Sequence, residues 1–463
     1  MWTEEQWAVI EPKSASSAVV VAAPGSGKTT VMTEHLAQVI ATGRIPAQRI
    51  LAMTFTRQAA EHMRQKLRKH ERLRTVDAES CAMGTFHAVF FRALLEADRQ
   101  VYPVLGQREQ YALMREAIAD VFGERHATSM YEIQSYLTLY SRTVGGQKQG
   151  EVEEKSKRIL ASYVRRKRER SRWDHDDILL ASIDLLESGS SAKSRLFQMS
   201  YILVDEFQDT NGLQWALLTS LVERTGAFAF VVGDDDQSIY AFRGASPVYL
   251  QRAAEVLPNA QQYLLTANFR SDRAILRHAG QLIRHVRIRV DKPLRGVRDA
   301  EGVCLACEVQ DRAAQWRLAA QLIRRATLER QSMAILARTR SQLALAWTEL
   351  RRAFGGEWDL LAKGIEFRTF HDSKGKEWDV VALLDMAVPF DVTLDSDEER
   401  RLLYVAMTRA RHELYALVPR VWGGVAMRAH PFLLESGIKF GRVNGRNLGS
   451  KLGEKSLDFS GCN

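Results

Sequence analysis

One segment near the start of the chain restricts its fold more than any other. Residues 17–22 are a short apolar run rich in valine, which is typical of a buried strand. The next residues form a glycine-containing loop: Ala22-Ala23-Pro24-Gly25-Ser26-Gly27-Lys28-Thr29. A helix-like segment, residues 29–41, follows the loop, so its backbone N–H groups would point at an anion near a helix N-terminus. This order predicts a parallel α/β domain with a phosphate-binding loop.

The rest of the chain continues this alternation of strands and helices. Further strand candidates are residues 49–55, 201–204, 228–232, 302–309, 332–337, 365–370 and 380–386. Residues 88–173 differ, because they are helix-rich and strongly charged and lack strand-like runs. We therefore predict an α/β protein with two parallel-sheet domains. The predicted parts are residues 1–87 and 179–267 (first domain), 88–178 (helical insertion in the first domain), 268–435 (second domain) and 436–463 (flexible basic tail).

Composition narrows the class of protein. The chain has 463 residues, of which 46% are hydrophobic, and this is enough to build sizeable cores. Its net charge of +9 is compatible with a polyanionic partner. Four cysteines are too few for a disulfide scaffold and fit a reducing compartment. The sequence lacks a signal-like N-terminus and a membrane-spanning run, so we expect a cytoplasmic protein without membrane contact.

A second element completes the predicted nucleotide site. The apolar strand 201–204 ends in Asp205 and Glu206. Lys28 would supply a charge to the β- and γ-phosphates of ATP, and the Thr29 hydroxyl and the Asp205 carboxylate would hold Mg²⁺. Glu206 would accept the proton from the attacking water. The alternative interpretation, an acidic strand end exposed to solvent, explains the carboxylates alone but not their combination with the loop.

Several motifs in order resemble those of the UvrD/Rep/PcrA helicases, which are superfamily 1A DNA helicases that move 3′ to 5′. They cover residues 6 to about 435. The resemblance implies that both parallel-sheet domains are RecA-like and that the helical insertion is the family's subdomain 1B. Besides the loop and 204–210, the motifs are Gln6, 54–60, 84–87, 232–245, 268–271, 369–378 and 399–410. Residue 22 is alanine where the first loop glycine is usual, and residue 30 is threonine where many relatives carry arginine.

The resemblance implies roles for further residues at the nucleotide. Gln6 would read adenine, Phe269 would stack on it and Glu377 would bind the ribose. Gln237 would sense the γ-phosphate, and Arg270 and Arg409 would reach it as arginine fingers. The loop residues Ala23, Pro24, Gly25, Ser26 and Gly27, together with Thr30, would complete the nucleotide contacts. Singly, each has an alternative, such as core packing for Phe269 or a surface ion pair for either arginine.

The resemblance also implies a track for single-stranded DNA. Base-stacking candidates are Phe55, Phe86, His87, Tyr240, Phe242 and Arg243, and phosphate-contact candidates are Thr56, Arg338, Thr369 and His371. Trp422, beside Gly423-Gly424, would be the tip of a strand-separating hairpin. Packing between domains is the alternative for the aromatic residues. Phe242 replaces a usual tryptophan, and the basic run 164–172 is a solvated helix face or a duplex-binding patch.

One family feature is missing. Only about thirty residues separate Arg338 from Thr369, where the relatives insert the helical subdomain called 2B. We therefore expect a compact ATP-dependent 3′-to-5′ translocase or helicase that acts on single-stranded DNA and single-strand/duplex junctions. The alternative is a DNA-stimulated ATPase that senses DNA ends and regulates a partner nuclease, for example in an anti-phage defence complex. An RNA motor is a third interpretation.

Overall fold

The computed structural model describes residues 2–11, 16–73, 75–146, 152–188, 194–389 and 396–442. The chain forms two compact units. The first comprises Met1–Ala22 and Gly27–Leu265, and the second comprises Ala23–Ser26 and Thr266–Asn463. The tip of the glycine loop is thus grouped with the second unit, whereas Gly27 and Lys28 belong to the first.

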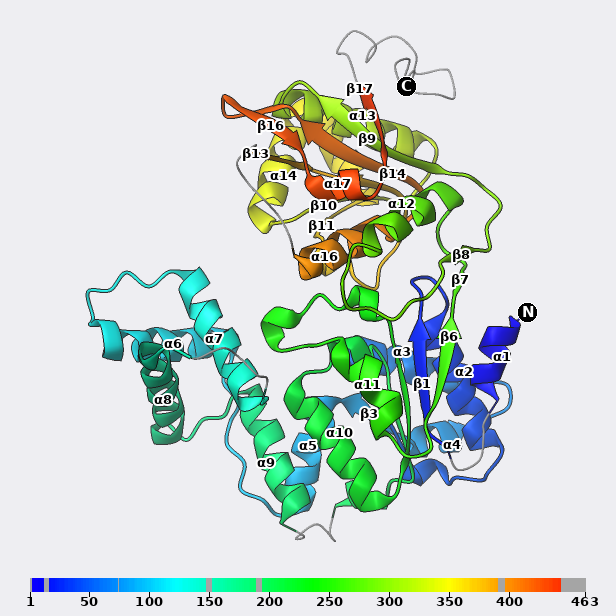
Figure 1. The fold of residues 1–463 in the computed structure, drawn as a ribbon, viewed down its shortest axis with the longest axis vertical. Helices are drawn as coiled ribbons and strands as arrows, with labels where there is room; N and C mark the ends of the chain where they lie inside the picture. The colour runs from blue at the N-terminus through cyan, green and yellow to red at the C-terminus, as the bar shows by residue number, and fades with distance from the viewer. Residues whose placement is uncertain are drawn as a thin grey trace. The chain divides into compact units, whose positions relative to one another are not determined.

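The first unit is built on a parallel sheet in the order β3-β2-β4-β5-β1-β6. Figure 1 labels β1, β3 and β6 of this sheet. Its strands are β1 (Ala18–Ala22), β2 (Ile50–Thr54), β3 (Ala82–Thr85), β4 (Tyr201–Val204), β5 (Phe228–Gly233) and β6 (Gln261–Leu265). The central strands β1, β2, β4 and β5 are almost wholly buried, which explains why they appear as unbroken apolar runs in the sequence. Parallel sheets need this cover on both faces.

Helices surround this sheet. They are α1 (Glu4–Ile10), α2 (Lys28–Ala41), α3 (Arg57–Arg68), α4 (Thr75–Ser80), α5 (Phe86–Glu96), α9 (His175–Glu187), α10 (Gly212–Thr225) and α11 (Val248–Val256). Side chains of α1, α2 and α3 form one apolar core with alternate residues of β1, β2, β4 and β5. Helix α11 contacts β1 and β5, and α9 packs on α5 and α10.

Three helices form a separate apolar cluster in the middle of the chain. They are α6 (Gln107–Phe122), α7 (Met130–Val144) and α8 (Glu154–Glu169), and their core includes Leu113, Ile133 and Tyr163. The predicted limits of the helical insertion, residues 88 and 178, fall inside α5 and α9. Both of these helices pack on other parts of the first unit.

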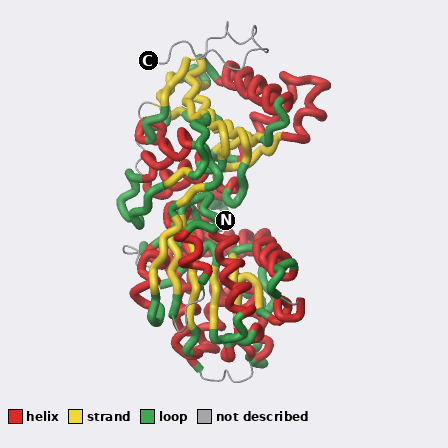
Figure 2. Tube along the Cα trace, turned by 90° about the vertical axis from the view of Figure 1, so that its right-hand side faces the viewer, coloured by secondary structure: helices red, strands yellow, loops and turns green. Residues whose placement is uncertain are grey.

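The second unit has its own parallel sheet, in the order β11-β10-β12-β14-β9-β17. The strands are β9 (Val303–Val309), β10 (Met333–Ala337), β11 (Ile365–Thr369), β12 (Trp378–Leu383), β14 (Ala410–Pro419) and β17 (Lys439–Arg442). The helices are α12 (Arg273–Ile283), α13 (Arg312–Leu328), α14 (Arg340–Phe354), α15 (Trp358–Leu361), α16 (Asp397–Met407) and α17 (Pro431–Glu435). In each unit helices flank the strands (Figure 2), which confirms the predicted α/β class.

Two small sheets complete the second unit within the described residues. Strand β16 (Val425–Ala429) pairs with β13 (Ala387–Pro389) and with β15 (Val421–Trp422), and β7 (Ala267–Asn268) pairs in parallel with β8 (Arg295–Gly296). The prediction of a mobile tail from residue 436 is wrong at its start, because β17 joins the edge of the sheet beside β9. Residues 443–463 lie outside the described part of the chain. Within the described residues, every helix is too short or too polar to span a membrane.

A buried histidine in the core of the first unit predicts that the stability of the fold falls at acidic pH. The ring of His35 lies 4.5 Å from that of Phe230, with Nδ1 3.1 Å from Ile10 O and Nε2 2.8 Å from Tyr201 Oη. Because a carbonyl only accepts, Nδ1 carries the proton and Nε2 accepts from Tyr201. Burial lowers the pKa of His35 to about 4.

The unfolded chain therefore binds a proton at higher pH than the folded chain does. We expect His35 to remove about 2 kcal/mol from the free energy of unfolding as the pH falls from 7 to 5. Urea unfolding at both pH values should show a smaller decrease for His35→Gln than for the wild type. Equal decreases would contradict this assignment.

Candidate functional site

The glycine loop connects β1 to α2, and two positive φ angles shape it. Gly25 has φ +66° and Gly27 has φ +80°, a region that side chains other than glycine seldom adopt. The tip is also crowded, since a Cβ on Gly25 would lie 2.8 Å from Arg270 Cβ. Asn268 Nδ2 donates a hydrogen bond of 2.6 Å to Pro24 O, within the second unit. Backbone geometry thus requires glycine at both positions.

The structure brings together the residues predicted to hold Mg²⁺. Thr29 lies in the first turn of α2, and Asp205 follows directly after β4. The Thr29 hydroxyl donates a hydrogen bond of 2.9 Å to Asp205 Oδ2. Burial, and after it the charge of the neighbouring Glu206, raises the pKa of Asp205 to about 6, although the bond from Thr29 opposes the shift.

Glu206 is held by a network that sequence analysis did not identify. Its backbone adopts the left-handed conformation, with φ +52°. Gln208, in the short helix η3 (Phe207–Asp209), donates from Nε2 to Glu206 Oε2 at 2.5 Å. The same amide accepts from Asp234 N at 2.9 Å, and Asp234 Oδ2 accepts from Gln237 Nε2 at 2.5 Å. Gln208 and Asp234 therefore link the proposed base to the proposed γ-phosphate sensor.

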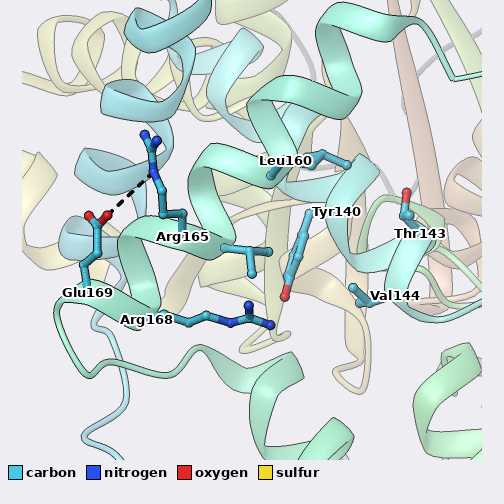
Figure 3. Close-up of a pocket in the computed structure, with 9 residues that line it drawn as sticks. Tyr140, Thr143, Val144, Leu160, Arg165, Arg168 and Glu169 are labelled. Carbon is cyan, nitrogen blue, oxygen red and sulfur yellow. Dashed lines mark ion pairs between the residues drawn. The ribbon is translucent and has the colours of Figure 1, made fainter.

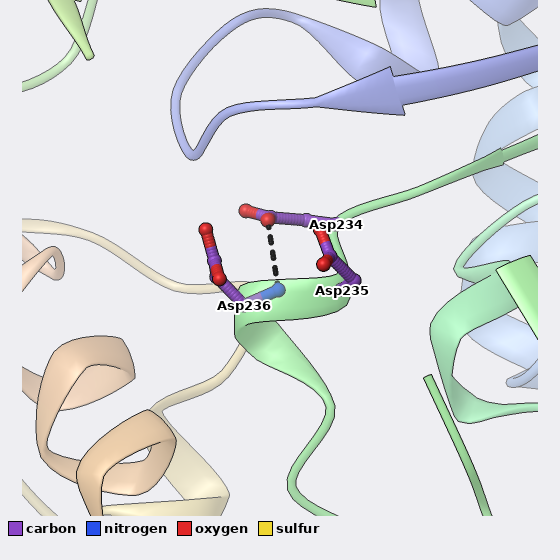
Figure 4. Close-up of side chains that lie close together, drawn as sticks. All are labelled: Asp234, Asp235 and Asp236. Atoms are coloured by element: carbon purple, nitrogen blue, oxygen red, sulfur yellow. Dashed lines mark hydrogen bonds between the residues drawn. The ribbon is translucent and has the colours of Figure 1, made fainter. Parts of the chain in front are cut away.

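Three buried aspartates follow β5. The carboxylates of Asp234, Asp235 and Asp236 lie within 4.8 Å of one another (Figure 4). Asp234 accepts from Asp236 N at 3.3 Å and so caps the short helix η4 (Asp235–Gln237). Asp235 Oδ2 accepts from Gln251 Nε2 at 3.2 Å. We assign this cluster to holding the turn that carries Gln237.

Gln6 and Thr30 also lie beside the loop. Gln6 is buried, its Oε1 accepts from Thr3 N at 3.1 Å, and this bond is part of the capping box that begins α1. Its Nε2 lies 3.5 Å from where a Cβ on Gly27 would stand. Thr30 Oγ1 lies 3.5 Å from Lys66 Nζ of α3, which places a cation beside the residue that replaces the usual arginine. Sequence analysis missed Lys66, because only the fold brings α3 to α2.

The second unit presents its predicted nucleotide residues around Glu377. Arg270 Nε donates to Glu377 Oε2 at 2.5 Å, and Arg411 donates to Glu377 Oε1. Burial alone would raise the pKa of Glu377, but the hydrogen bond from Arg411 and the charge of Arg270 lower it overall. Arg409 is 1% exposed and donates to Val405 O at 2.8 Å. Phe269, in contrast, is 39% exposed and free to meet a planar ligand.

Aromatic candidates for DNA contact form two groups in the first unit. The first group consists of Tyr240 and the short helix η5 (Ala241–Arg243) that follows it. The Arg243 guanidinium lies 5.2 Å from the Tyr240 ring centre and 5.5 Å from that of Phe242. In the second group the ring centres of Phe55 and Phe86 lie 6.3 Å apart, and His87 follows Phe86 in the chain. Phe86 is only 1% exposed and stacks on Phe90, so we withdraw it from the base contacts.

His87 has a neighbour that the motifs did not reveal. The exposed His175, at the start of α9, lies with its ring centre 4.9 Å from that of His87. Burial, and then the charge of His175, lowers the pKa of His87 to about 4. The two rings are 88 positions apart in sequence (175 minus 87), so only the packing of α9 on α5 brings them together.

The phosphate candidates have partners within their own units. Thr56 caps α3 by accepting from Ala59 N at 3.1 Å. Arg338 forms a two-point ion pair with Glu399, at 3.0 and 2.7 Å, and would have to leave it to bind phosphate. Thr369 is buried and accepts from Asp372 N, and His371 begins the short helix η8 (His371–Ser373).

The predicted hairpin is formed by β15 and β16. Gly423 and Gly424, with φ +56° and +81°, make its turn, and Trp422 pairs with Val425 immediately beside it. Trp422 is therefore next to the tip rather than at it. The Arg312 guanidinium lies 3.9 Å from the Trp422 ring centre and is itself paired with the buried Asp385 at 2.7 Å.

A cavity of about 480 Å³ lies between α7 and α8 (Figure 3). Its walls combine apolar side chains such as Val144 and Leu160 with Arg165, Arg168 and Glu169. Arg165 and Glu169 form an ion pair at 3.7 Å. Sequence analysis did not predict this cavity, because the two helices are separated along the chain and meet only through packing.

Comparison with known proteins assigns the family. The UvrD/REP helicase N-terminal domain matches residues 2–258, and the UvrD-like helicase C-terminal domain matches residues 365–417. The chain therefore belongs to the UvrD/Rep helicase family, as its motifs predicted.

Individual relatives are similar over part of their length. The putative ATP-dependent DNA helicase YjcD of Bacillus subtilis (strain 168) is 32% identical over 61% of this chain and 38% of its own. The ATP-dependent DNA helicase PcrA of Leuconostoc citreum is 31% identical over 60% and 38%. DNA helicase II of Escherichia coli (strain K12) is 31% identical over 66% and 43%. The chain thus spans less than half the length of these relatives.

Proposed function

We propose that this chain is an ATP-driven motor that moves 3′ to 5′ along single-stranded DNA and separates duplex strands. The observation that carries the proposal is the contact of Thr29 with Asp205, next to Lys28 and Glu206. It joins the glycine loop to an acidic strand end, which is the pairing that phosphoryl transfer needs. Family membership and the names of the relatives support the choice of DNA as the track.

The donor set at this point fits Mg²⁺. A hydroxyl and a carboxylate are hard oxygen ligands, and Mg²⁺ uses one or two of them together with substrate phosphates. Thr29 and Asp205 would hold the ion, which would neutralise charge on the phosphates when bound. The Lys28 ammonium, at the first position of α2, would bind the same phosphates.

The remaining residues define the chemical step. Glu206 takes a proton from water, the water oxygen attacks the γ-phosphorus, and the bond to the bridging oxygen of ADP breaks. Gln208 holds the Glu206 carboxylate, and the link through Asp234 to Gln237 connects it to the phosphate sensor. We further propose that Arg270 and Arg409 stabilise the γ-phosphate charge, that Phe269 and Gln6 contact adenine, and that Glu377 binds the ribose.

The DNA track is proposed to use rings for bases and polar groups for phosphates. Tyr240, Phe242 and Arg243 form one stacking surface, and Phe55 and His87 are further stacking candidates. Stacking contributes about 1–3 kcal/mol per base and accepts any base, which suits a motor. Thr56, Arg338, Thr369 and His371 stay candidates for phosphate contact.

The hairpin gives a test of strand separation. We expect Trp422→Ala to lower the rate of unwinding of a 3′-tailed duplex several-fold, because the flat ring beside the turn is lost. ATP hydrolysis stimulated by single-stranded DNA should stay close to wild type, since Trp422 lies outside the nucleotide residues. Arg312→Ala should act in the same direction, because Arg312 stacks on this ring. Equal losses of unwinding and hydrolysis would contradict a strand-separating role.

A second function is favoured by the segment between β10 and β11. Residues 338–364 hold only α14, α15 and short turns, without the helical subdomain 2B that the resembling helicases insert there. A regulatory ATPase that senses DNA ends for a partner nuclease would need hydrolysis without strand displacement. Wild-type protein that hydrolyses ATP with single-stranded DNA but fails to unwind the tailed duplex would support this second function. Stronger stimulation by RNA than by DNA would contradict both.

A further inference from the structure

We propose that helix α7 is a positioning element for the DNA-stacking loop, acting through Arg142 and Thr138. The inference rests on the proposed function, because it takes Tyr240, Phe242 and Arg243 to be DNA contacts. It goes further by assigning a role to a helix that the motifs leave unexplained. The claim is that α7 holds the loop in its stacking conformation without touching DNA itself.

The contacts run from α7 side chains to backbone carbonyls of η5. Arg142 donates from Nε and Nη2 to Ala241 O, at 3.2 and 2.8 Å. The Thr138 hydroxyl lies 2.8 Å from Phe242 O and also within reach of Gln134 O. Residues 138 and 142 are four apart and so share one face of α7. Hydrogen bonds from a charged guanidinium are stronger than those from a neutral hydroxyl, so Arg142 contributes more than Thr138 to fixing η5.

The loop also makes backbone hydrogen bonds of its own. Arg243 N donates to Tyr240 O at 2.8 Å, Gly244 N to Ala241 O at 3.0 Å, and Ala245 N to Tyr240 O at 3.2 Å. Tyr240 and Phe242 are half-buried and Arg243 is exposed. A constraint from outside a short turn reduces the number of conformations that its backbone can sample. Arg142 and Thr138 supply this constraint at successive carbonyls.

Helix α7 can act as a support because its other face is anchored. Lys167 of α8 is 2% exposed, and its Nζ lies 2.6 Å from both Asp174 Oδ2 and Asp177 Oδ2. The same ammonium donates to Tyr140 Oη at 3.0 Å, and the Ser141 hydroxyl donates to Asp176. Breaking such a buried charge network is costly, so α7 is fixed to α8 and α9.

The end of α7 also contacts α10, another helix of the first unit. Gly145 follows the last residue of the helix and meets Gly212, at the start of α10. A Cβ on Gly212 would lie 2.0 Å from Gly145 O, so both backbones approach as closely as glycine permits. Helix α7 is therefore held in place both at its end and along its side. Because α7 is fixed, its hydrogen bonds to η5 also fix the position of η5.

The consequence is a loop preorganised for bases. With the backbone held, the Arg243 guanidinium stays near both rings, and less conformational entropy is lost when DNA binds. Loss of Arg142 should therefore raise the DNA concentration needed for half-maximal stimulation of ATP hydrolysis. The maximal rate and the DNA-independent rate should change little, since Arg142 does not contact the nucleotide residues.

The experiment compares Arg142→Ala with Arg115→Ala in the full chain. Arg115 is an exposed arginine of α6, so its removal changes the net charge equally without touching η5. We expect Arg142→Ala to raise the half-saturating concentration of oligo-dT about tenfold, and Arg115→Ala to leave it within about twofold. Arg142→Lys, which keeps one donor, should fall between them.

Two further measurements separate the outcomes. If Arg142 bound phosphate directly, its loss would reduce the slope of log Kd against log salt concentration by about 1, whereas a positioning role leaves the slope unchanged. If Arg142→Ala fails to fold, Thr138→Val decides, with a smaller rise expected in the same direction. An unchanged half-saturating concentration in the folded variants overturns the inference. A wild type that neither binds oligo-dT nor is stimulated by it overturns the proposed function instead.

Discussion

Glu206→Gln is expected to lower the kcat for ATP hydrolysis by about 10²–10⁴-fold, the usual contribution of a general base. The amide keeps the shape of the side chain and can still meet Gln208, but it cannot accept a proton from water. Nucleotide affinity should stay close to wild type, because Lys28 and Thr29 are untouched. Phosphate release and binding of a fluorescent ATP analogue would measure the two effects.

Two comparisons make this result specific. Lys28→Ala should lose nucleotide affinity as well as turnover, since it removes a positive charge from the phosphates. Glu223→Gln, an exposed carboxylate on α10, should change neither. Hydrolysis by Glu206→Gln at nearly the wild-type rate would show that another group accepts the proton.

Arg270→Ala is expected to reduce kcat by about 10³-fold, the lower end of the range for an arginine finger. The structure offers a matched control, because Arg270 and Arg411 both pair with Glu377. Arg411→Ala removes the same kind of ion pair without removing the proposed finger. It should therefore raise the KM for ATP, through Glu377 and the ribose, more than it lowers kcat.

The comparison decides between two roles for Arg270. Similar losses of kcat in both variants would mean that the arginines act by orienting Glu377, and that neither contacts the γ-phosphate. Each variant leaves Glu377 with one arginine partner, so we expect both variants to stay folded. Thermal unfolding of both would check this expectation.

Much of the fold was predictable because its signals are local. The strands of both sheets are short apolar runs, and strands buried on both faces of a parallel sheet need this composition. The glycine loop was predictable for the same reason, since a positive φ at Gly25 and Gly27 needs glycine itself. The start of the tail was misjudged, because Lys439–Arg442 is polar at its ends and becomes a strand only by pairing with β9.

The candidate site also has parts that local sequence signals predict and parts that depend on contacts between distant segments. Residues that act within one motif, such as Asp205 with Glu206, were named from the sequence. The bridge from Glu206 through Gln208 and Asp234 to Gln237 was not predicted, because it depends on side-chain directions after two different strands. Phe86 was assigned to DNA by its motif, yet it is buried against Phe90.

The sequence by itself determined the family, the α/β class and the identity of the phosphate loop with its acidic partner strand. These follow from backbone geometry and from residue types at fixed short spacings, which need no knowledge of packing. Only the tertiary structure decided that Lys66 lies beside Thr30, that His175 lies beside His87, and that Arg142 of α7 bonds to the backbone of η5. Such contacts join segments far apart in the chain, and their partners are chosen by how helices pack, which leaves no periodic or local signal in the sequence.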